Sequence, residues 1–179
     1  MLERLKSKRL YSIVFLTLVV LISVSLLLWI NSYTSVVVEA QRQARIKSIL
    51  ESIFPELTGF EESGEIFNVY KDNRIIGYTF IATGRGYGGR ISVLIGINPD
   101  YNIEGMEVLS HTETPGLGNK ITEEPFTKQF LGLGVDGIAL SRDGGEIDAI
   151  TGATISSRAV TTAVQERMFE IIEILSGEG

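Results

Sequence analysis

The decisive stretch of this sequence is Asp148-Ala149-Ile150-Thr151-Gly152-Ala153-Thr154, which lies just before the last predicted helix. Two threonine hydroxyls bracket a Gly-Ala pair, and an aspartate stands three positions before the first of them. Gly152 can adopt a positive φ and lets a ligand approach the backbone closely. Thr154 is expected at or next to the N-cap, where unpaired N–H groups and the positive end of the helix dipole favour an anion. The stretch therefore predicts a phosphate-binding geometry that contains a threonine hydroxyl.

The helix behind this stretch is predicted from Ile155 to Leu175. Apolar side chains recur there at steps of four, four, three and four, and so share one helical face: Val160, Val164, Met168, Ile171 and Leu175. A plain N-cap is the alternative role for Thr154, because Ser and Thr are frequent at that position and stabilise a helix by about 1 kcal/mol. Helix rules alone favour this simpler role.

The composition excludes several kinds of chemistry. The chain has 179 residues, of which 44% are hydrophobic, and fits one domain plus an additional apolar segment. It contains no cysteine and a single histidine, His111. Disulfides, thiolate nucleophiles, iron–sulfur clusters, CxxCH haem attachment and Cys/His zinc sites are therefore excluded, and no metal site is expected. If this protein handles electrons, it needs an organic cofactor.

Charge is divided unevenly along the chain. Residues 1–30 hold four basic residues against one acidic residue, whereas residues 31–179 hold twelve against twenty-one. The second part is thus strongly acidic, and no cluster of basic residues follows Arg9. Binding to a phosphate backbone depends on such clusters, so nucleic acid is not an expected partner.

Residues 10–30 predict a membrane anchor. They form a run of 21 residues without charge, long enough at 1.5 Å per residue to cross a hydrocarbon core of about 30 Å. Basic residues precede the run and the next one is Arg42, so the positive-inside rule places residues 1–9 in the cytoplasm and the remainder outside. A cleaved signal peptide is the alternative, but its apolar region spans only about 7–15 residues. We expect a single-pass anchor in the cytoplasmic (inner) membrane.

Residues 31–55 predict a spacer helix that Pro55 ends, and residues 56–179 predict an α+β domain with a mainly antiparallel sheet flanked by helices. Alternating apolar residues bounded by turn signals indicate the strands, which are expected at residues 66–70, 75–83, 91–97, 103–109, 135–140 and 147–150. A short helix is expected over about residues 122–131, with Pro125 in its first turn.

Two loops of this domain stand out. The glycine cluster Gly84–Gly89 joins two strand patterns, and no helix follows it, which excludes a Rossmann fingerprint and a P-loop and favours a bend between strands. Ser110–Gly118 follows a strand directly and is rich in polar and turn-forming residues, as is common where sites are built at a sheet edge. A lone histidine such as His111 more often makes a structural hydrogen bond than performs chemistry.

Both stretches resemble motifs of the FMN-binding domain family. Asp148-x-x-Thr-Gly-Ala-Thr is similar to the flavinylation motif of that family, and His111-x-Glu-Thr-Pro-Gly-Leu-Gly closely resembles its second signature. Within the family the chain resembles the G subunits of ion-translocating Rnf electron transport complexes, with the C subunits of Na+-translocating NADH:quinone reductases as relatives. The resemblance extends over the anchor, the spacer helix and both motifs.

The resemblance implies a role for each motif residue. Thr154 would carry FMN through a phosphoester that a dedicated flavin transferase forms, Thr151, Gly152 and Ala153 would shape the attachment turn, and Asp148 would belong to the recognition motif of the transferase. The glycine cluster would lie near the flavin, together with residues of the second signature: His111, Glu113, Thr114, Gly116, Leu117 and Gly118.

The function implied is a membrane-anchored covalent flavoprotein that relays electrons within an ion-translocating ferredoxin:NAD oxidoreductase. Such a relay needs no catalytic acid or base and is not a stand-alone catalyst. Its partners would be the other subunits of the complex, the flavin transferase and the membrane. Three alternatives remain: an extracytoplasmic binding or regulatory domain of this fold without flavin, a subunit that serves assembly only, and a subunit of a related NADH:quinone reductase.

Overall fold

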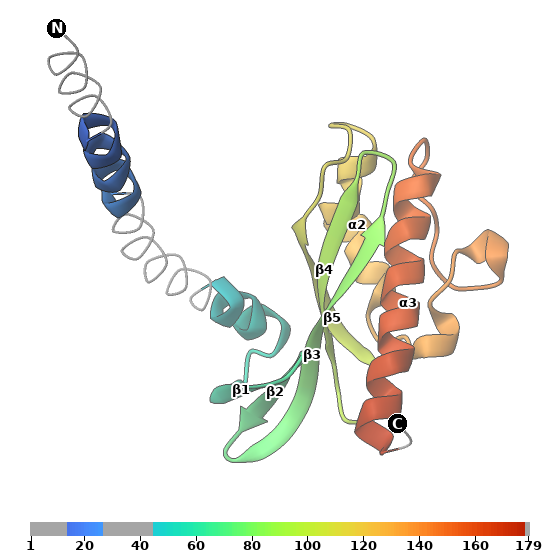
Figure 1. Cartoon of the computed structure of the whole chain (residues 1–179). Coiled ribbons are helices and arrows are strands. Elements are labelled where there is room, and N and C mark those ends of the chain that lie inside the picture. Colours follow the sequence, from blue (N-terminus) through green and yellow to red (C-terminus); the bar gives the residue numbers. More distant parts are fainter. Residues whose placement is uncertain (1–13, 27–44, 178–179) are drawn as a thin grey trace, which may run out of the picture. The chain divides into compact units, whose positions relative to one another are not determined.

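The computed structural model describes residues 14–26 and 45–177, and the chain divides into two compact units, residues 1–47 and 48–179. Residues 14–26 form a helix (Figure 1). Their side chains are exposed. Within these described ranges, none of the helices combines the length and the apolar character that crossing a membrane requires. The expected anchor at residues 10–30 extends beyond the described residues at both ends, and the expected segment 1–9 lies outside them. Both stay predictions.

The second unit contains a five-stranded antiparallel meander, in the order β1-β2-β3-β4-β5, as predicted for an α+β domain. The strands are β1 Gly59–Ser63, β2 Ile66–Lys71, β3 Arg74–Arg85, β4 Arg90–Ile97 and β5 Ile103–Ser110. Four of them confirm predicted strands, whereas β1 was not predicted. Asp72 and Asn73, with φ of 49° and 64°, form the two-residue turn between β2 and β3. Positive φ at both positions matches the twist of a tight hairpin.

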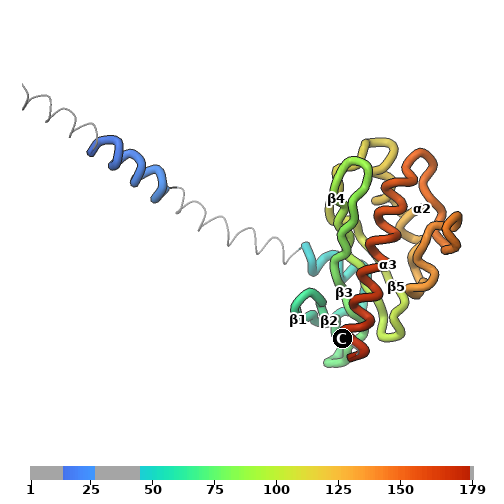
Figure 2. Tube along the Cα trace, turned by 45° about the vertical axis from the view of Figure 1, so that its right-hand side comes forward, coloured from blue at the N-terminus to red at the C-terminus, as the bar shows by residue number. Residues whose placement is uncertain are grey.

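One face of the sheet is covered by α3, Thr154–Ser176, which lies along β3 and β4 in both ribbon views (Figures 1 and 2). Four of the five residues on the predicted apolar face have no exposed surface: Val160, Val164, Met168 and Ile171. Helix and strand approach closely at Gly84, where a Cβ atom would come within 2.4 Å of the Ala159 carbonyl oxygen. The predicted helix is confirmed, and glycine in β3 permits its close packing.

The opposite face of the sheet receives the end of a helix that spans residues 45–53. Its last residue, Ile53, and the following Phe54 pack against glycines on three neighbouring strands: Gly77, Gly96 and Gly105. A Cβ atom on Gly77 would lie 2.5 Å from the Phe54 ring, so the ring fills the space that the missing side chains leave. The helix predicted before Pro55 is confirmed over residues 45–53, and the earlier part of that prediction lies outside the described residues.

The segment between β5 and α3 differs from the prediction. Residues 135–140 and 147–150 do not form strands; the segment contains the 3-10 helices η3 (Val135–Gly137) and η4 (Ser141–Asp143) and one isolated bridge between Leu140 and Ile147. The apolar residues here are buried because they insert singly into the core, not because they pair in a sheet.

The short helix predicted over about residues 122–131 is broken into three pieces. These are η1 (Gly118–Thr122), α2 (Glu124–Thr127) and η2 (Lys128–Phe130). Pro125 lies in the first turn of α2 as predicted. Phe126 and Phe130 are buried and pack edge to face, with 5.5 Å between their ring centroids. These two rings hold the segment against the core.

Candidate functional site

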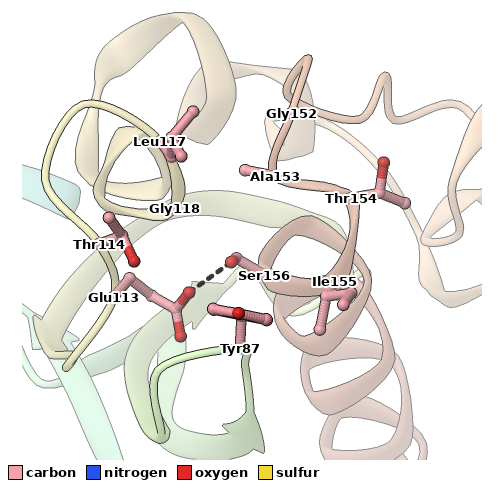
Figure 3. A pocket seen from close by; sticks show the side chains of 10 residues that line it. All are labelled: Tyr87, Glu113, Thr114, Leu117, Gly118, Gly152, Ala153, Thr154, Ile155 and Ser156. Carbon is pink, nitrogen blue, oxygen red and sulfur yellow. Dashed lines mark hydrogen bonds between the residues drawn. The ribbon is translucent and has the colours of Figure 1, made fainter.

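Three segments that are distant in the sequence surround a cavity of about 450 Å³, called here the first cavity (Figure 3). Tyr87 comes from the β3–β4 hairpin and residues 152–156 come from the start of α3. The loop after β5 supplies the remaining lining residues: Glu113, Thr114, Leu117 and Gly118. The volume lies within the range of about 300–1,000 Å³ that is usual for small-molecule sites.

A tight turn leads the chain into α3. The Ala153 N–H donates to the Ile150 carbonyl oxygen at 2.9 Å, and Gly152 has a φ of 78°. Ser157, which has no exposed surface, holds this turn against the helix. Its hydroxyl oxygen accepts a hydrogen bond from the Ile150 N–H at 3.0 Å and donates to the Ala153 carbonyl oxygen at 3.1 Å. The backbone at the start of α3 is thus fixed by hydrogen bonds of its own.

Thr154 is the first residue of α3, so the prediction that it lies at or next to the N-cap is confirmed. The capping role is wrong, because Ala153 occupies the N-cap and no side chain caps the helix. Within the described residues no hydrogen bond of the Thr154 hydroxyl is found, and the side chain is half-buried and points away from Glu113 and Ser156 (Figure 3). In helix geometry, the first N–H groups also lack carbonyl partners. The Thr154 hydroxyl thus stands beside backbone N–H groups that have no carbonyl partner in the helix.

Glu113 joins the three segments of the first cavity. Its carboxylate accepts hydrogen bonds from the Gly88 N–H at 2.9 Å and from the Ser156 hydroxyl at 2.5 Å, and the residue is only 6% exposed (Figure 3). Gly86 and Gly118 make room for it, since Cβ atoms there would come within 2.3 and 2.4 Å of the carboxylate oxygens. Charge-assisted hydrogen bonds of this kind are among the stronger ones in proteins.

The glycine cluster forms a bend between β3 and β4, as predicted, and lies against the loop after β5. The Thr112 hydroxyl donates to the Gly88 carbonyl oxygen at 3.0 Å, and a Cβ atom on Gly88 would approach the Thr112 carbonyl oxygen to 2.1 Å. Glycine is required at this position because the two backbones are nearly in contact.

Seven of the eleven predicted site residues line the first cavity: Glu113, Thr114, Leu117, Gly118, Gly152, Ala153 and Thr154. The other four do not. Thr151 and Gly116 are exposed in their turns. His111 accepts a hydrogen bond at Nδ1 from the Glu113 N–H at 3.2 Å, and so supports the backbone that carries the carboxylate. Asp148 is exposed, accepts from the Ser141 hydroxyl at 2.8 Å, and donates through its N–H to Gln129.

Three lining residues were not predicted: Tyr87, Ile155 and Ser156. Tyr87 and Ile155 are 73% and 57% exposed, and Leu117 is 48% exposed, so large apolar side chains surround the cavity. The position of Tyr87 inside the glycine cluster was the available signal for it. Within the part of the chain that the structure describes, no group of three acidic or imidazole side chains is placed to hold a metal ion. The exposed side chains of Tyr87, Leu117 and Ile155 give the first cavity a largely apolar rim.

Comparison with known proteins gives a consistent set of relatives. Residues 86–168, which include every lining residue of the first cavity, match the family model of the FMN-binding domain. The chain is 34% identical to the G subunit of the ion-translocating oxidoreductase complex of Methanosarcina acetivorans, over 84% of this chain and 89% of that protein.

A second relative is the G subunit of the proton-translocating ferredoxin:NAD(+) oxidoreductase complex of Clostridium ljungdahlii, which is 31% identical over 82% of this chain and 83% of its own length. Among solved structures, Shewanella oneidensis NqrC has the same fold, with a TM-score of 0.50 at 21% identity over 64% of this chain and 67% of that one.

Proposed function

The chain belongs to the family of G subunits of ion-translocating oxidoreductase complexes and carries an FMN-binding domain, and from this premise we propose that it is a covalent FMN carrier which relays electrons within such a complex. The ferredoxin:NAD oxidoreductase that the Clostridium ljungdahlii relative is named for is the complex we propose. FMN would supply chemistry that no side chain of this cysteine-free chain offers, the transfer of one or two electrons.

The residues of the first cavity fit FMN. The open N–H groups at the start of α3 suit its phosphate, and the exposed apolar rim formed by Tyr87, Leu117 and Ile155 suits its ring. Asn119, which follows the lining residue Gly118, has a buried side-chain oxygen without a hydrogen-bond partner among the described residues. Buried acceptors are usually paired, so this oxygen offers a further polar contact.

The observation that carries the proposal is the Thr154 hydroxyl. It borders the first cavity, it is not used for capping, and it stands at the helix terminus that best accommodates a phosphate. We propose that its oxygen forms a bond to the phosphorus of FMN. The donor is an activated flavin phosphoanhydride held by the transferase; the anhydride P–O bond breaks, and the hydroxyl proton leaves with the departing phosphate. Asp148 and Thr151, both exposed, are the motif residues that a transferase can reach.

A covalent bond has a clear physical advantage here. A phosphodiester keeps one negative charge, and a helix N-terminus stabilises such a charge by only about 0.3–1 kcal/mol. That is far too little to retain a cofactor at a site open to the medium outside the cytoplasm. We propose that residues 10–30 anchor the chain in the cytoplasmic membrane, with the domain of residues 56–179 on the outer side and the neighbouring subunits as its electron partners.

Replacement of Thr154 by alanine tests the proposal. In membranes of cells that contain the flavin transferase, the band of the native chain is expected to fluoresce under ultraviolet light after denaturing electrophoresis, and Thr154→Ala is expected to abolish this signal. Thr122→Ala is the matched control, because this exposed threonine lies outside the cavity, and its band should fluoresce like the native one. A dark native band would reject the proposal and favour a domain of the same fold without a redox role.

A further inference from the structure

A second cavity, of about 430 Å³, lies between β3 and α3. Thr154 borders both cavities, so its side chain stands between them. The floor of the second cavity includes Gly84, where helix and strand are in close contact. The two cavities differ in their lining: the first has a carboxylate and an apolar rim, whereas the second is bordered by two arginines, Arg85 and Arg158. A single group attached to Thr154 can therefore reach two different environments.

Arg158 is placed to act at Thr154. It lies four residues further along α3, hence on the same helical face, with a rise of about 6 Å between the two Cα atoms. Side chains on a helix lean toward its N-terminus, which favours positions of the guanidinium near the turn that contains Thr154. Asp143 accepts from one guanidinium nitrogen of Arg158, at 2.9 Å to Oδ2 and 3.3 Å to Oδ1. The pairing uses one nitrogen, and the other N–H groups of Arg158 remain available for an anion.

The charge of the second cavity is polarised along the helix. Arg85 adds a second cation at the end of the cavity near Thr154. It lies opposite Arg90 on the neighbouring strand, and the repulsion between these two like charges destabilises the protein when no anion is bound. No ion pair of Arg85 or Arg90 is found in the described part of the chain. Glu166, the acidic residue of the cavity, lies twelve residues beyond Thr154, a rise of about 18 Å. An anion at Thr154 is thus three times nearer to Arg158 than to Glu166 along the axis.

We propose that the second cavity is the phosphoryl subsite of this protein: Arg158, with Arg85 as a supporting charge, binds the phosphate group while the ring occupies the first cavity. The inference rests on the proposed function, because it assigns the FMN phosphate to this subsite. Arginine suits the role, since its planar guanidinium matches the oxygens of a phosphate. Thr154 then lies at the boundary between the ring subsite and the phosphoryl subsite, where a phosphoester to its hydroxyl can form without moving either part.

The test uses the full chain produced without flavin transferase, so that Thr154 is unmodified. FMN and riboflavin differ only in the phosphate, and each is titrated while quenching of flavin fluorescence is followed. The native chain is expected to bind FMN more tightly than riboflavin. Arg158→Gln is expected to weaken FMN binding by about three- to tenfold, the size of one partly exposed charged contact, and to leave riboflavin binding within about twofold. Inorganic phosphate should compete with FMN but not with riboflavin.

Asp143→Asn separates a phosphate-binding role of Arg158 from a merely structural one. If Arg158 served only to hold η4 through its ion pair, loss of either partner would have the same effect. The proposal instead predicts that Asp143→Asn preserves or strengthens FMN binding, because it removes the competing carboxylate. Equal binding of FMN and riboflavin, no measurable binding of either at millimolar concentration, or parallel losses in the two variants would overturn the proposal.

The outcome is separable from that of the proposed function. A dark band in native membranes, together with a preference for FMN that depends on Arg158, would reject covalent attachment and keep the phosphoryl subsite. A fluorescent band without any effect of Arg158→Gln on FMN binding would keep covalent attachment and reject the phosphoryl subsite.

Discussion

Glu113 shows how a single side chain can hold a site together. Its carboxylate is nearly buried, and it is bonded to the backbone of the glycine loop and to the hydroxyl of Ser156, 43 residues away in the sequence. An apolar environment makes an unpaired polar group costly, so the two donors and the carboxylate depend on one another. The three segments around the first cavity are thereby fixed relative to each other before any ligand binds.

Replacement of Glu113 should therefore destabilise the flavin-free domain. We predict that Glu113→Gln lowers the free energy of unfolding by about 1–3 kcal/mol, because one of the two donors loses a charged acceptor or meets an amide N–H group. Urea denaturation of the flavin-free chain measures this. Glu107→Gln, an exposed position on β5, is the control and should change the stability by less than about 0.5 kcal/mol. Equal stability of the two variants would show that the carboxylate carries no structural role.

The residues of the site differ in how far the sequence alone identifies them. Glu113 and Thr154 lie in motifs whose resemblance to a family can be seen in the sequence alone. Ser156 could not be assigned in that way, because its role depends on a carboxylate brought close only by folding. Nor could Arg158, because the cavity that it borders together with Thr154 forms only when α3 packs against β3.

Among the elements, the contact between α3 and β3 positions the site. Gly84 lets the helix backbone come so near the strand that an added Cβ atom would meet the Ala159 carbonyl oxygen at 2.4 Å. A backbone atom cannot move aside as the end of a flexible side chain can. We predict that Gly84→Ala lowers the free energy of unfolding by about 1–3 kcal/mol, the usual cost of overpacking.

Gly59→Ala is the control for this prediction. Gly59 lies at the edge of the sheet, in β1, and a Cβ atom there would have no neighbour within 4 Å. The Gly59→Ala substitution should therefore leave the midpoint of urea denaturation almost unchanged. If Gly84→Ala were as stable as Gly59→Ala, the helix would not be held at the distance seen here.

The strands that were predicted correctly show their burial in the local sequence pattern. The elements that were predicted wrongly depend on whether a neighbouring strand is available for pairing. In β2 to β5, apolar residues either alternate with polar ones or form a continuous run, and turn-forming residues bound each strand. This pattern is typical of strands that pack against a hydrophobic core. Strand β1, Gly59–Ser63, has two glutamates and one large apolar residue, and it exists because it pairs with β2. The segment of residues 135–150 has an alternating pattern, but no strand is available there to pair with it beyond one bridge.

At the scale of the whole molecule, the chain combines an apolar N-terminal run with a strongly acidic remainder. If residues 10–30 anchor the chain as we propose, this acidic remainder would be repelled by anionic lipid headgroups. The FMN-binding domain match, residues 86–168, covers every lining residue of the first cavity but not the first three strands, so the family pattern identifies that site more fully than it identifies the fold.

The proposed anchor at residues 10–30 gives a prediction for the 179-residue chain. The full chain should remain with the membranes after extraction with alkaline carbonate, because a run of 21 uncharged residues favours the hydrocarbon core. A version that lacks residues 1–30 should be released into the soluble fraction. Release of the full chain under the same conditions would reject the anchor.

We propose that the oxygen of Thr154 is bonded to the phosphate of FMN. The protein is isolated from cells that contain the flavin transferase and is digested with trypsin. Mass spectrometry of the peptide that spans residues 143–158 then detects the bond to Thr154 directly. We expect a peptide heavier by one FMN less one water, with fragment ions that assign the addition to Thr154 and leave Thr151 unmodified. An unmodified peptide, or an addition on Thr151, would contradict it.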